Sequence, residues 1–102
     1  MSSIGKGGYV YIMSNKYRTV LYIGVTCDLN TRVIEHKSEY GSTFTKKYNC
    51  TDVLYYEFYD SIEEAIHREK CLKKYKRSWK EKLIRKLNPG MKDLFDEISD
   101  FR

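Results

Sequence analysis

The 102-residue sequence predicts an α+β fold, in which a central three-stranded antiparallel sheet is flanked by helices. Three short runs of β-branched and aromatic residues indicate strands. Helix-starting residues followed by helical apolar spacing come between and after these runs. The order strand, strand, helix, strand, helix, helix favours a sheet with helices packed on it. We expect residues 1–102 to form one domain, with a flexible lead-in at 1–7 and a C-terminal tail at 95–102.

The first two predicted strands, residues 9–13 and 21–25, flank a polar turn and form a hairpin. Side chains alternate along a strand, so Tyr11 and Tyr22 share one face if the aliphatic residues face the core. Gly24 beside them leaves space where a backbone or a ligand can approach closely. A tyrosine-rich hairpin without any function explains the same pattern, because tyrosine is a good strand residue.

The first helix is predicted from Leu29 to about Lys37, after the helix-starting residues 26–28. On it, Arg32 and His36 are one turn apart and lie at the edge of the buried face. Both side chains therefore become candidates for a polar site.

Residues 38–48 mix glycine, serine and threonine with Lys46 and Lys47. This composition favours a loop that contacts phosphate groups. The third strand follows at residues 53–59 and is rich in aromatic residues.

Two further helices are predicted from serine–glutamate capping boxes, in which the serine precedes the glutamate by three residues. Ser61 starts a helix that runs to about Tyr75, and Ser78 starts another that ends at residues 88–90. Residues 91–101 form a last short helix or a tail.

Glu69 lies in the centre of the apolar stripe of the helix that starts after Ser61. The apolar members of this stripe are Ile62, Ala65, Ile66 and Leu72. An unpaired carboxylate in this position is costly, so Glu69 needs a cation. A metal ion and an internal ion pair with Arg32 are the two alternatives.

Positive charge is concentrated in residues 68–86, which carry ten Lys or Arg and two acids. The whole chain has a net charge of +5, so the remainder is negative. Tyr75 and Trp79 stand among these cations, a mixture that suits phosphate contact and base stacking. A solvated helix face explains the charge equally well, and Trp79 can instead anchor the core.

The composition excludes several other classes of protein. Three widely spaced cysteines, Cys27, Cys50 and Cys71, form neither a disulfide framework nor a metal-binding pair. No apolar run is long enough for a membrane helix, and the N-terminus lacks the apolar core of a signal peptide. We therefore expect a cytoplasmic protein without a membrane partner.

Taken together, these residues resemble the GIY-YIG nuclease superfamily. Tyr9-Val10-Tyr11, ten further residues and Tyr22-Ile23-Gly24 resemble the two halves of its signature. The pattern from Asp28 to His36 is similar to the first-helix motif, and Arg68-Glu69-Lys70 resembles the segment with the metal-binding glutamate. The end of the match, residues 83–94, is similar to small stand-alone bacterial members. The N-terminal domain of excinuclease C, a DNA-repair protein, is of the same kind.

The resemblance implies a metal-dependent endonuclease that hydrolyses phosphodiester bonds in DNA, with RNA as an alternative substrate. It implies that Tyr11 acts as general base or orients water, and that Tyr22 bonds to water or phosphate. Arg32 would stabilise the phosphate and His36 would assist proton transfer. Glu69 would hold a single Mg²⁺ or Mn²⁺.

Further expectations about the site follow from the same resemblance and from the charge. Asn88 matches a polar position near the site. The predicted nucleic-acid-binding residues are cationic: Lys46, Lys47, Arg68, Lys70, Lys73, Lys74 and Arg77. DNA and structured RNA are the expected partners, and the protein is expected to be a monomer or a weak homodimer.

Two departures from the family pattern bear on these roles. The first half of the signature reads Tyr-Val-Tyr, and Thr26 stands where some branches place a lysine near the site. A nucleic-acid-binding module with little activity of its own, acting with a partner, remains the alternative function. The small size of the chain, which leaves little room for sequence readout, favours that alternative.

Overall fold

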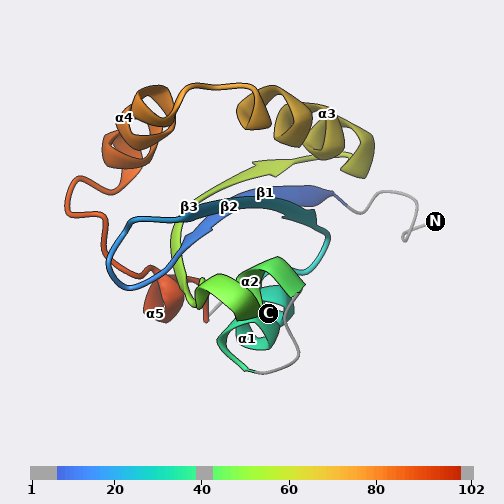
Figure 1. Ribbon diagram of the computed structural model, residues 1–102. Helices are drawn as coiled ribbons and strands as arrows, with labels where there is room; N and C mark the ends of the chain where they lie inside the picture. Colours follow the sequence, from blue (N-terminus) through green and yellow to red (C-terminus); the bar gives the residue numbers. More distant parts are fainter. Residues whose placement is uncertain (1–6, 39–42, 100–102) are drawn as a thin grey trace.

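The computed structural model describes residues 7–38 and 43–99, and within this part the three predicted strands form one antiparallel sheet (Figure 1). The strands are β1 (Gly8–Ser14), β2 (Leu21–Thr26) and β3 (Asp52–Tyr59). Their order is β2-β1-β3, so β1 is central and the hairpin partner β2 lies at one edge. The predicted α+β class and antiparallel sheet are confirmed. Most of the predicted lead-in and the last three residues of the tail lie outside the described residues.

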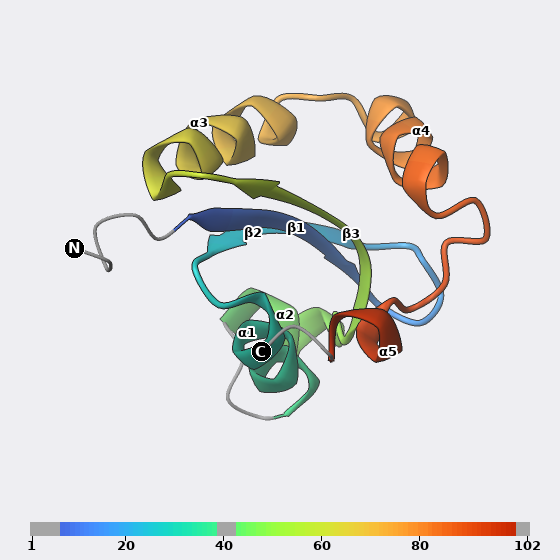
Figure 2. The same ribbon diagram turned by 180° about the vertical axis from the view of Figure 1, so that it is seen from behind.

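Helices cover both faces of this sheet (Figures 1 and 2). On one face lie α3 (Ile62–Lys73) and α4 (Arg77–Leu87). On the other face lie the three remaining helices of the described residues: α1 (Leu29–Lys37), α2 (Thr43–Tyr48) and α5 (Phe95–Ile98). None of the helices in the described part of the chain is long and apolar enough to cross a membrane.

The alternation along β1 divides the buried side chains between two cores, as the hairpin pattern predicts. Val10 and Ile12 point into the core under α3 and α4. That core also contains Ile23, Leu54, Ala65, Leu72 and Ile84. Tyr11 and Met13 point to the opposite side, into a second core with Leu29, Val33, Val53 and Ile98. Both faces of β1 are therefore buried from Val10 to Met13.

The prediction of a loop over residues 38–48 is wrong at its C-terminal end, because Thr43–Tyr48 forms α2. Thr45 in this helix is buried against α1, and its carbonyl accepts a hydrogen bond from the N–H of Cys50 at 3.0 Å. Residue composition favoured a loop because threonine is a weak helix former. The contact with α1 is tertiary and cannot be read from local sequence.

The two predicted capping boxes have different outcomes. Ser61 caps α3 as expected, since its hydroxyl accepts from the N–H of Glu64 at 3.2 Å. The box at Ser78 is wrong, because α4 begins at Arg77 with Lys76 as its N-cap, two residues before the predicted cap. Glu81 instead accepts a bond from the Arg77 guanidinium at 2.9 Å.

The turn between β1 and β2 is tied to distant parts of the chain through Arg18. This residue has a positive φ of 61°, and its guanidinium donates to the Asp52 carboxylate at 2.8 Å and the Met91 carbonyl at 2.9 Å. Arg77 donates to the carbonyls of Arg18 and Thr19 at 2.6 and 3.0 Å. The start of α4 is thus fixed to the hairpin turn.

Candidate functional site

Tyr11 lies in the middle of β1 with only 2% of its surface exposed. Its ring lies over Gly24 of the neighbouring strand: a Cβ added to Gly24 would come within 2.4 Å of the Tyr11 hydroxyl oxygen. The space predicted beside Gly24 is therefore filled by the Tyr11 ring, and a ligand cannot enter there while the ring stays in place. The absence of a side chain at residue 24 allows the hydroxyl to reach edge strand β2.

His36 is placed beside this hydroxyl by α1. Asp28 caps that helix, since its carboxylate accepts from the N–H of Thr31 at 3.2 Å. Leu29 and Val33 anchor the buried face of α1, and His36, 3% exposed, lies on the same face. The Tyr11 hydroxyl lies 3.1 Å from His36 Nε2.

Thr45 completes a buried chain of three polar groups, because its hydroxyl oxygen lies 3.0 Å from His36 Nδ1. If Nδ1–H donates to Thr45, Nε2 accepts from the Tyr11 hydroxyl; the other tautomer reverses both hydrogen bonds. Thr45 was not among the predicted site residues. Its proximity depends on α2, which the sequence did not predict.

Burial keeps the Tyr11 hydroxyl and the His36 imidazole neutral. It lowers the pKa of His36 below its usual value, with a smaller effect of Arg32 in the same direction and an opposing one of Glu35. Burial also raises the pKa of Tyr11 well above its usual value, together with the neighbouring Tyr22. The resting pair is therefore a neutral phenol and, at neutral pH, a neutral imidazole.

Tyr22 lies on the same face as Tyr11, as predicted. Its ring centroid is 6.4 Å from that of Tyr11 and 5.6 Å from that of His36, the latter in an edge-on arrangement. The two tyrosines and the histidine thus form one aromatic cluster, built from both strands of the hairpin and from α1.

Arg32 is close to this cluster but exposed, with 46% of its side-chain surface accessible. Its guanidinium contacts Glu35 at 3.6 Å, a contact of exposed groups that contributes little to stability. Its charge lowers the pKa of Tyr11. Because its contact with Glu35 is weak, the Arg32 guanidinium can turn toward an anion at small cost.

Glu69 lies on α3 and its side chain is 14% exposed. The predicted alternative of an ion pair with Arg32 is wrong, because Glu69 pairs with Lys73 one turn along the helix, at 3.0 Å. The negative charge of Glu69 raises the pKa of Tyr11, so the carboxylate also acts on the same hydroxyl. Ile66, predicted to share the buried stripe, is 37% exposed.

The residues present fit a single divalent cation held by one carboxylate. Within residues 7–38 and 43–99, no group of three or more acidic, histidine or cysteine side chains lies together. Mg²⁺ does not need such a group, since it keeps several waters and borrows phosphate oxygens from its substrate. Glu69 is mostly buried and its partner Lys73 is 55% exposed, so the lysine can move aside.

Asn88 ends α4 and is 6% exposed. Its amide nitrogen donates to the carbonyls of Leu54 and Lys92 at 3.0 and 2.8 Å, and its oxygen accepts from the Lys92 N–H at 3.2 Å. These bonds hold the segment after α4 against β3.

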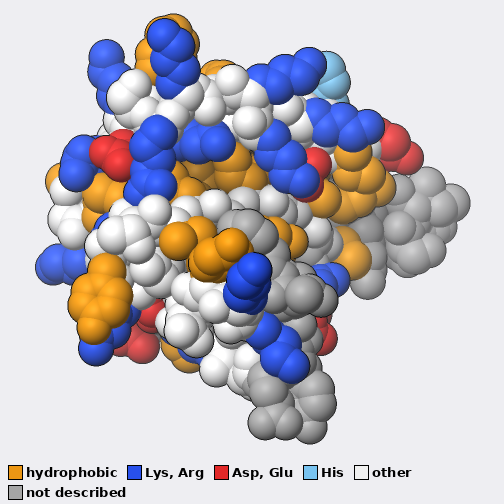
Figure 3. Space-filling view, in the orientation of Figure 1, with side chains coloured by type: hydrophobic (Ala, Val, Ile, Leu, Met, Phe, Trp, Pro, Cys, Tyr) orange, Lys and Arg blue, Asp and Glu red, His pale blue; other side chains and the backbone are white. Residues whose placement is uncertain are grey.

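The predicted nucleic-acid-binding residues fall into two groups. Most of them are exposed cations, and Figure 3 shows such side chains gathered over α3 and α4. The exposed members are Lys46, Lys47, Lys70, Lys73, Lys74 and Arg77. Arg68 differs, because its guanidinium donates to both carboxylate oxygens of Glu57 at 3.0 and 3.1 Å.

Comparisons with known proteins cover most of the chain. Residues 7–82 match the GIY-YIG catalytic domain. A UPF0213 protein of Staphylococcus saprophyticus is 36% identical over 76 residues, which are 74% of this chain and 92% of the relative. A UPF0213 protein of Natronomonas pharaonis is 34% identical over 76 residues, 74% and 88% of the two chains. One of Streptococcus pyogenes is 37% identical over 71 residues, 70% and 76% of the two chains. No solved structure matches at a significant level.

Proposed function

The chain belongs to the family of the GIY-YIG catalytic domain, which implies a nuclease-type function, and on this basis we propose that it is a metal-dependent endonuclease of DNA. The observation that carries the proposal is the buried contact of Tyr11 with His36, next to the exposed guanidinium of Arg32. It joins a proton donor and a proton acceptor beside a cation that can bind phosphate.

The proton path starts at a water bound beside the Tyr11 hydroxyl. Because burial raises the pKa of Tyr11, a resting phenolate is too costly to serve as the base. Tyr11 instead takes a proton from the water while it passes its own proton to His36 Nε2, 3.1 Å away. This path requires the tautomer in which Nδ1–H donates to Thr45 and Nε2 is the acceptor.

The water oxygen then attacks phosphorus, and the bond between phosphorus and the leaving sugar oxygen breaks. The leaving oxygen takes a proton from solvent, and His36 later returns its proton to solvent. Arg32 binds the phosphate oxygens that gain negative charge in the transition state. Tyr22, in the same aromatic cluster, orients the water or the phosphate.

Glu69 is the residue that would hold the Mg²⁺ or Mn²⁺ ion. A bound cation supplies charge neutralisation for the phosphate and the leaving oxygen. The role of the chain is to offer a mostly buried carboxylate within electrostatic reach of Tyr11.

The test is cleavage of supercoiled plasmid, single-stranded DNA and structured RNA, each with Mg²⁺, Mn²⁺ or EDTA. We expect plasmid nicking that EDTA abolishes. Tyr11→Phe keeps the packed ring and should lower the nicking rate about 100-fold or more. Tyr17→Phe removes a hydroxyl from a 73%-exposed ring and is the matched control. Full activity in Tyr11→Phe would refute the proton path.

A nucleic-acid-binding module that acts with a partner is the second candidate. The burial of Tyr11 favours it, because a partner or substrate that reshapes the site could then be required for turnover. Binding of plasmid without nicking in any metal, and nicking on addition of a cell extract, would favour this candidate over the first.

A further inference from the structure

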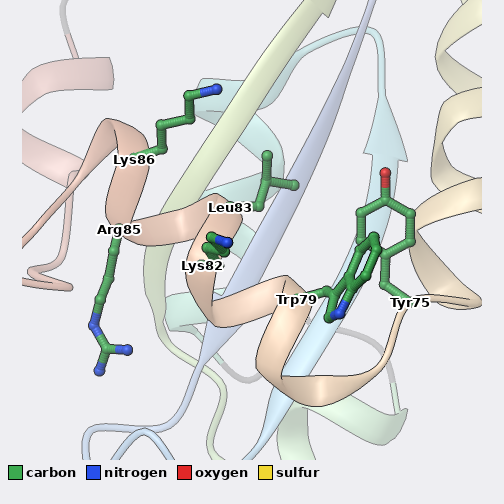
Figure 4. Close-up of a pocket in the computed structure, with 6 residues that line it drawn as sticks. All are labelled: Tyr75, Trp79, Lys82, Leu83, Arg85 and Lys86. Atoms are coloured by element: carbon green, nitrogen blue, oxygen red, sulfur yellow. The ribbon is translucent and has the colours of Figure 1, made fainter.

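A groove lies along α4, away from the Tyr11 cluster. Six residues line a hollow of about 600 Å³ here, which we name the α4 groove (Figure 4): Tyr75, Trp79, Lys82, Leu83, Arg85 and Lys86. Within α4, residues 79, 82, 83 and 86 recur at helical spacing and so share one face.

Aromatic surface is available at one end of the α4 groove. Trp79 is 62% exposed, so it does not anchor the core. Its ring meets that of Tyr75 edge-on, with centroids 5.9 Å apart and planes at 77° (Figure 4). The Arg68 guanidinium carbon lies 5.9 Å from the Tyr75 centroid, which places this ring between a cation and Trp79. The large indole face is left in solvent.

Unpaired positive charge lies next to the aromatic rings. Glu81, the acid within α4, contacts Arg77 at 2.9 Å and Arg85 at 3.7 Å. Lys82 and Lys86 have no ion-pair partner among the described residues, and they lie one turn apart on the helix. Like charges at this spacing repel, so an anion bound between them is stabilised.

The α4 groove continues toward the sheet. A second hollow of about 210 Å³ shares Leu83 and Lys86 with it and is also lined by Tyr55, Tyr56 and Leu87. Tyr55 and Tyr56 belong to β3, the edge strand opposite β2. The second hollow therefore lies at the far edge of the sheet from Gly24, over which the Tyr11 hydroxyl is placed.

We propose that the α4 groove binds unpaired nucleotides of the substrate, with a base stacked on Trp79 and its phosphates held by Lys82 and Lys86. Stacking on an aromatic ring needs an open base face, which a duplex does not offer away from its ends, whereas a single strand does. The inference rests on the proposed function in taking nucleic acid as the partner. It adds the substrate class: nucleic acid with a single-stranded segment outside the cleavage site.

The chain contains one tryptophan and ten tyrosines, so indole fluorescence, excited where tyrosine does not absorb, reports on the α4 groove. The experiment titrates the protein, in EDTA, with a 15-nucleotide oligo-dT, with oligo-U of the same length and with a blunt 15-base-pair duplex. We expect either single strand to quench Trp79 and the duplex to quench it much less. Tyr17→Phe should give the same quenching as wild type, because its 73%-exposed ring lies outside the groove.

Two sets of variants test the assignment by anisotropy of a labelled oligo-dT. Trp79→Ala should weaken binding roughly 5- to 150-fold, the range of one stacked base, and Trp79→Phe should restore most of it. The double variant Lys82→Gln/Lys86→Gln should reduce the slope of log affinity against log salt by about 1.4, for two single-strand phosphates. The double variant Lys16→Gln/Lys92→Gln removes the same charge outside the groove and should change the slope less.

Equal quenching by duplex and single strand, or unchanged affinity in Trp79→Ala, would overturn the proposal. A change of Trp79 emission with protein concentration alone would assign the groove to a second copy of the chain and would also overturn it. These outcomes are separate from cleavage. Quenching of Trp79 without plasmid nicking supports nucleotide binding in the groove and counts against endonuclease activity. Nicking without quenching supports endonuclease activity and counts against nucleotide binding in the groove.

Discussion

At the scale of single residues, Thr45 is a positioning residue that acts through His36. Thr45→Val removes the hydroxyl that contacts Nδ1 and leaves the tautomer of His36 unfixed. The loss of about one hydrogen bond predicts a nicking rate lower by roughly tenfold. Without the Thr45 acceptor the imidazolium is less stable, so the acid limb of the pH–rate profile should move to lower pH.

Thr45→Ser restores the hydroxyl and should recover both the rate and the acid limb of wild type. A purely structural role for Thr45 would lower thermal stability without moving the acid limb. The pH–rate profile of plasmid nicking therefore distinguishes the two roles, and an unshifted limb in a slow Thr45→Val enzyme would contradict the positioning role.

Glu69 gives a second prediction at this scale. Glu69→Gln removes an ion pair with the exposed Lys73, so the free energy of unfolding should change by less than about 1 kcal/mol. Metal-dependent nicking should be lost, because the amide is a poor ligand for Mg²⁺. A thermal melt and a nicking assay on one preparation measure both. A variant that still cleaves at the wild-type rate would exclude the ligand role.

At the scale of elements, Glu57 connects β3 to α3. Its carboxylate accepts from Arg68 at 3.0 and 3.1 Å and from Tyr59 at 2.7 Å, and the Tyr55 hydroxyl also donates to it. Burial opposes ionisation of Glu57, but the bonds from Arg68, Tyr55 and Tyr59 outweigh it and lower its pKa. Glu57→Gln should lower the free energy of unfolding by about 2 kcal/mol at pH 7.

The lowered pKa of Glu57 sets the sign of the pH dependence of the free energy of unfolding. Because the pKa of Glu57 is lower in the folded protein, its contribution is fully present above the unfolded value of 4.5 and is lost as pH falls through the folded value. Melting temperatures between pH 7 and 3 should therefore converge for wild type and Glu57→Gln in acid. Glu63→Gln, an exposed neighbour on α3, is the control and should follow wild type.

The sequence predicts the start of a helix where neighbouring side chains cap it. It does not predict the start where contacts with distant parts of the chain fix it. The start of α3 was predicted because Ser61 and Glu64 cap it through their own side chains. The start of α4 was not, because Arg77 is fixed by carbonyls of the distant hairpin turn. At the site, alternation placed Tyr11 and Tyr22 on one face, but burial of Thr45 against His36 depends on the packing of α2 on α1.

At the scale of the whole molecule, the charge of residues 68–86 predicts binding that weakens steeply with salt. Lys70 lies in α3, Lys74 at the C-terminal cap of α3 and Lys80 in α4, and none of them forms an ion pair within the described part of the chain. Replacing all three by glutamine removes three cations. The slope of log affinity for duplex DNA against log salt should fall by up to about 2.7. Fluorescence anisotropy across salt concentrations of roughly 50 to 300 mM measures this slope. An unchanged slope would mean that the charge is only a solvated face.

The link from Arg18 to Met91 and from Arg77 to Arg18 sets an order of assembly for the chain. The hairpin leaves the ribosome first. The Met91 carbonyl, which accepts from Arg18, is synthesised 73 residues after Arg18, and the Arg77 guanidinium, which donates to the Arg18 carbonyl, is synthesised 59 residues after it. The turn and the start of α4 should consequently open and close as one cooperative unit. In native-state hydrogen exchange, the amides of both segments would then share one opening free energy, and folding during translation would be completed only when the C-terminal third emerges.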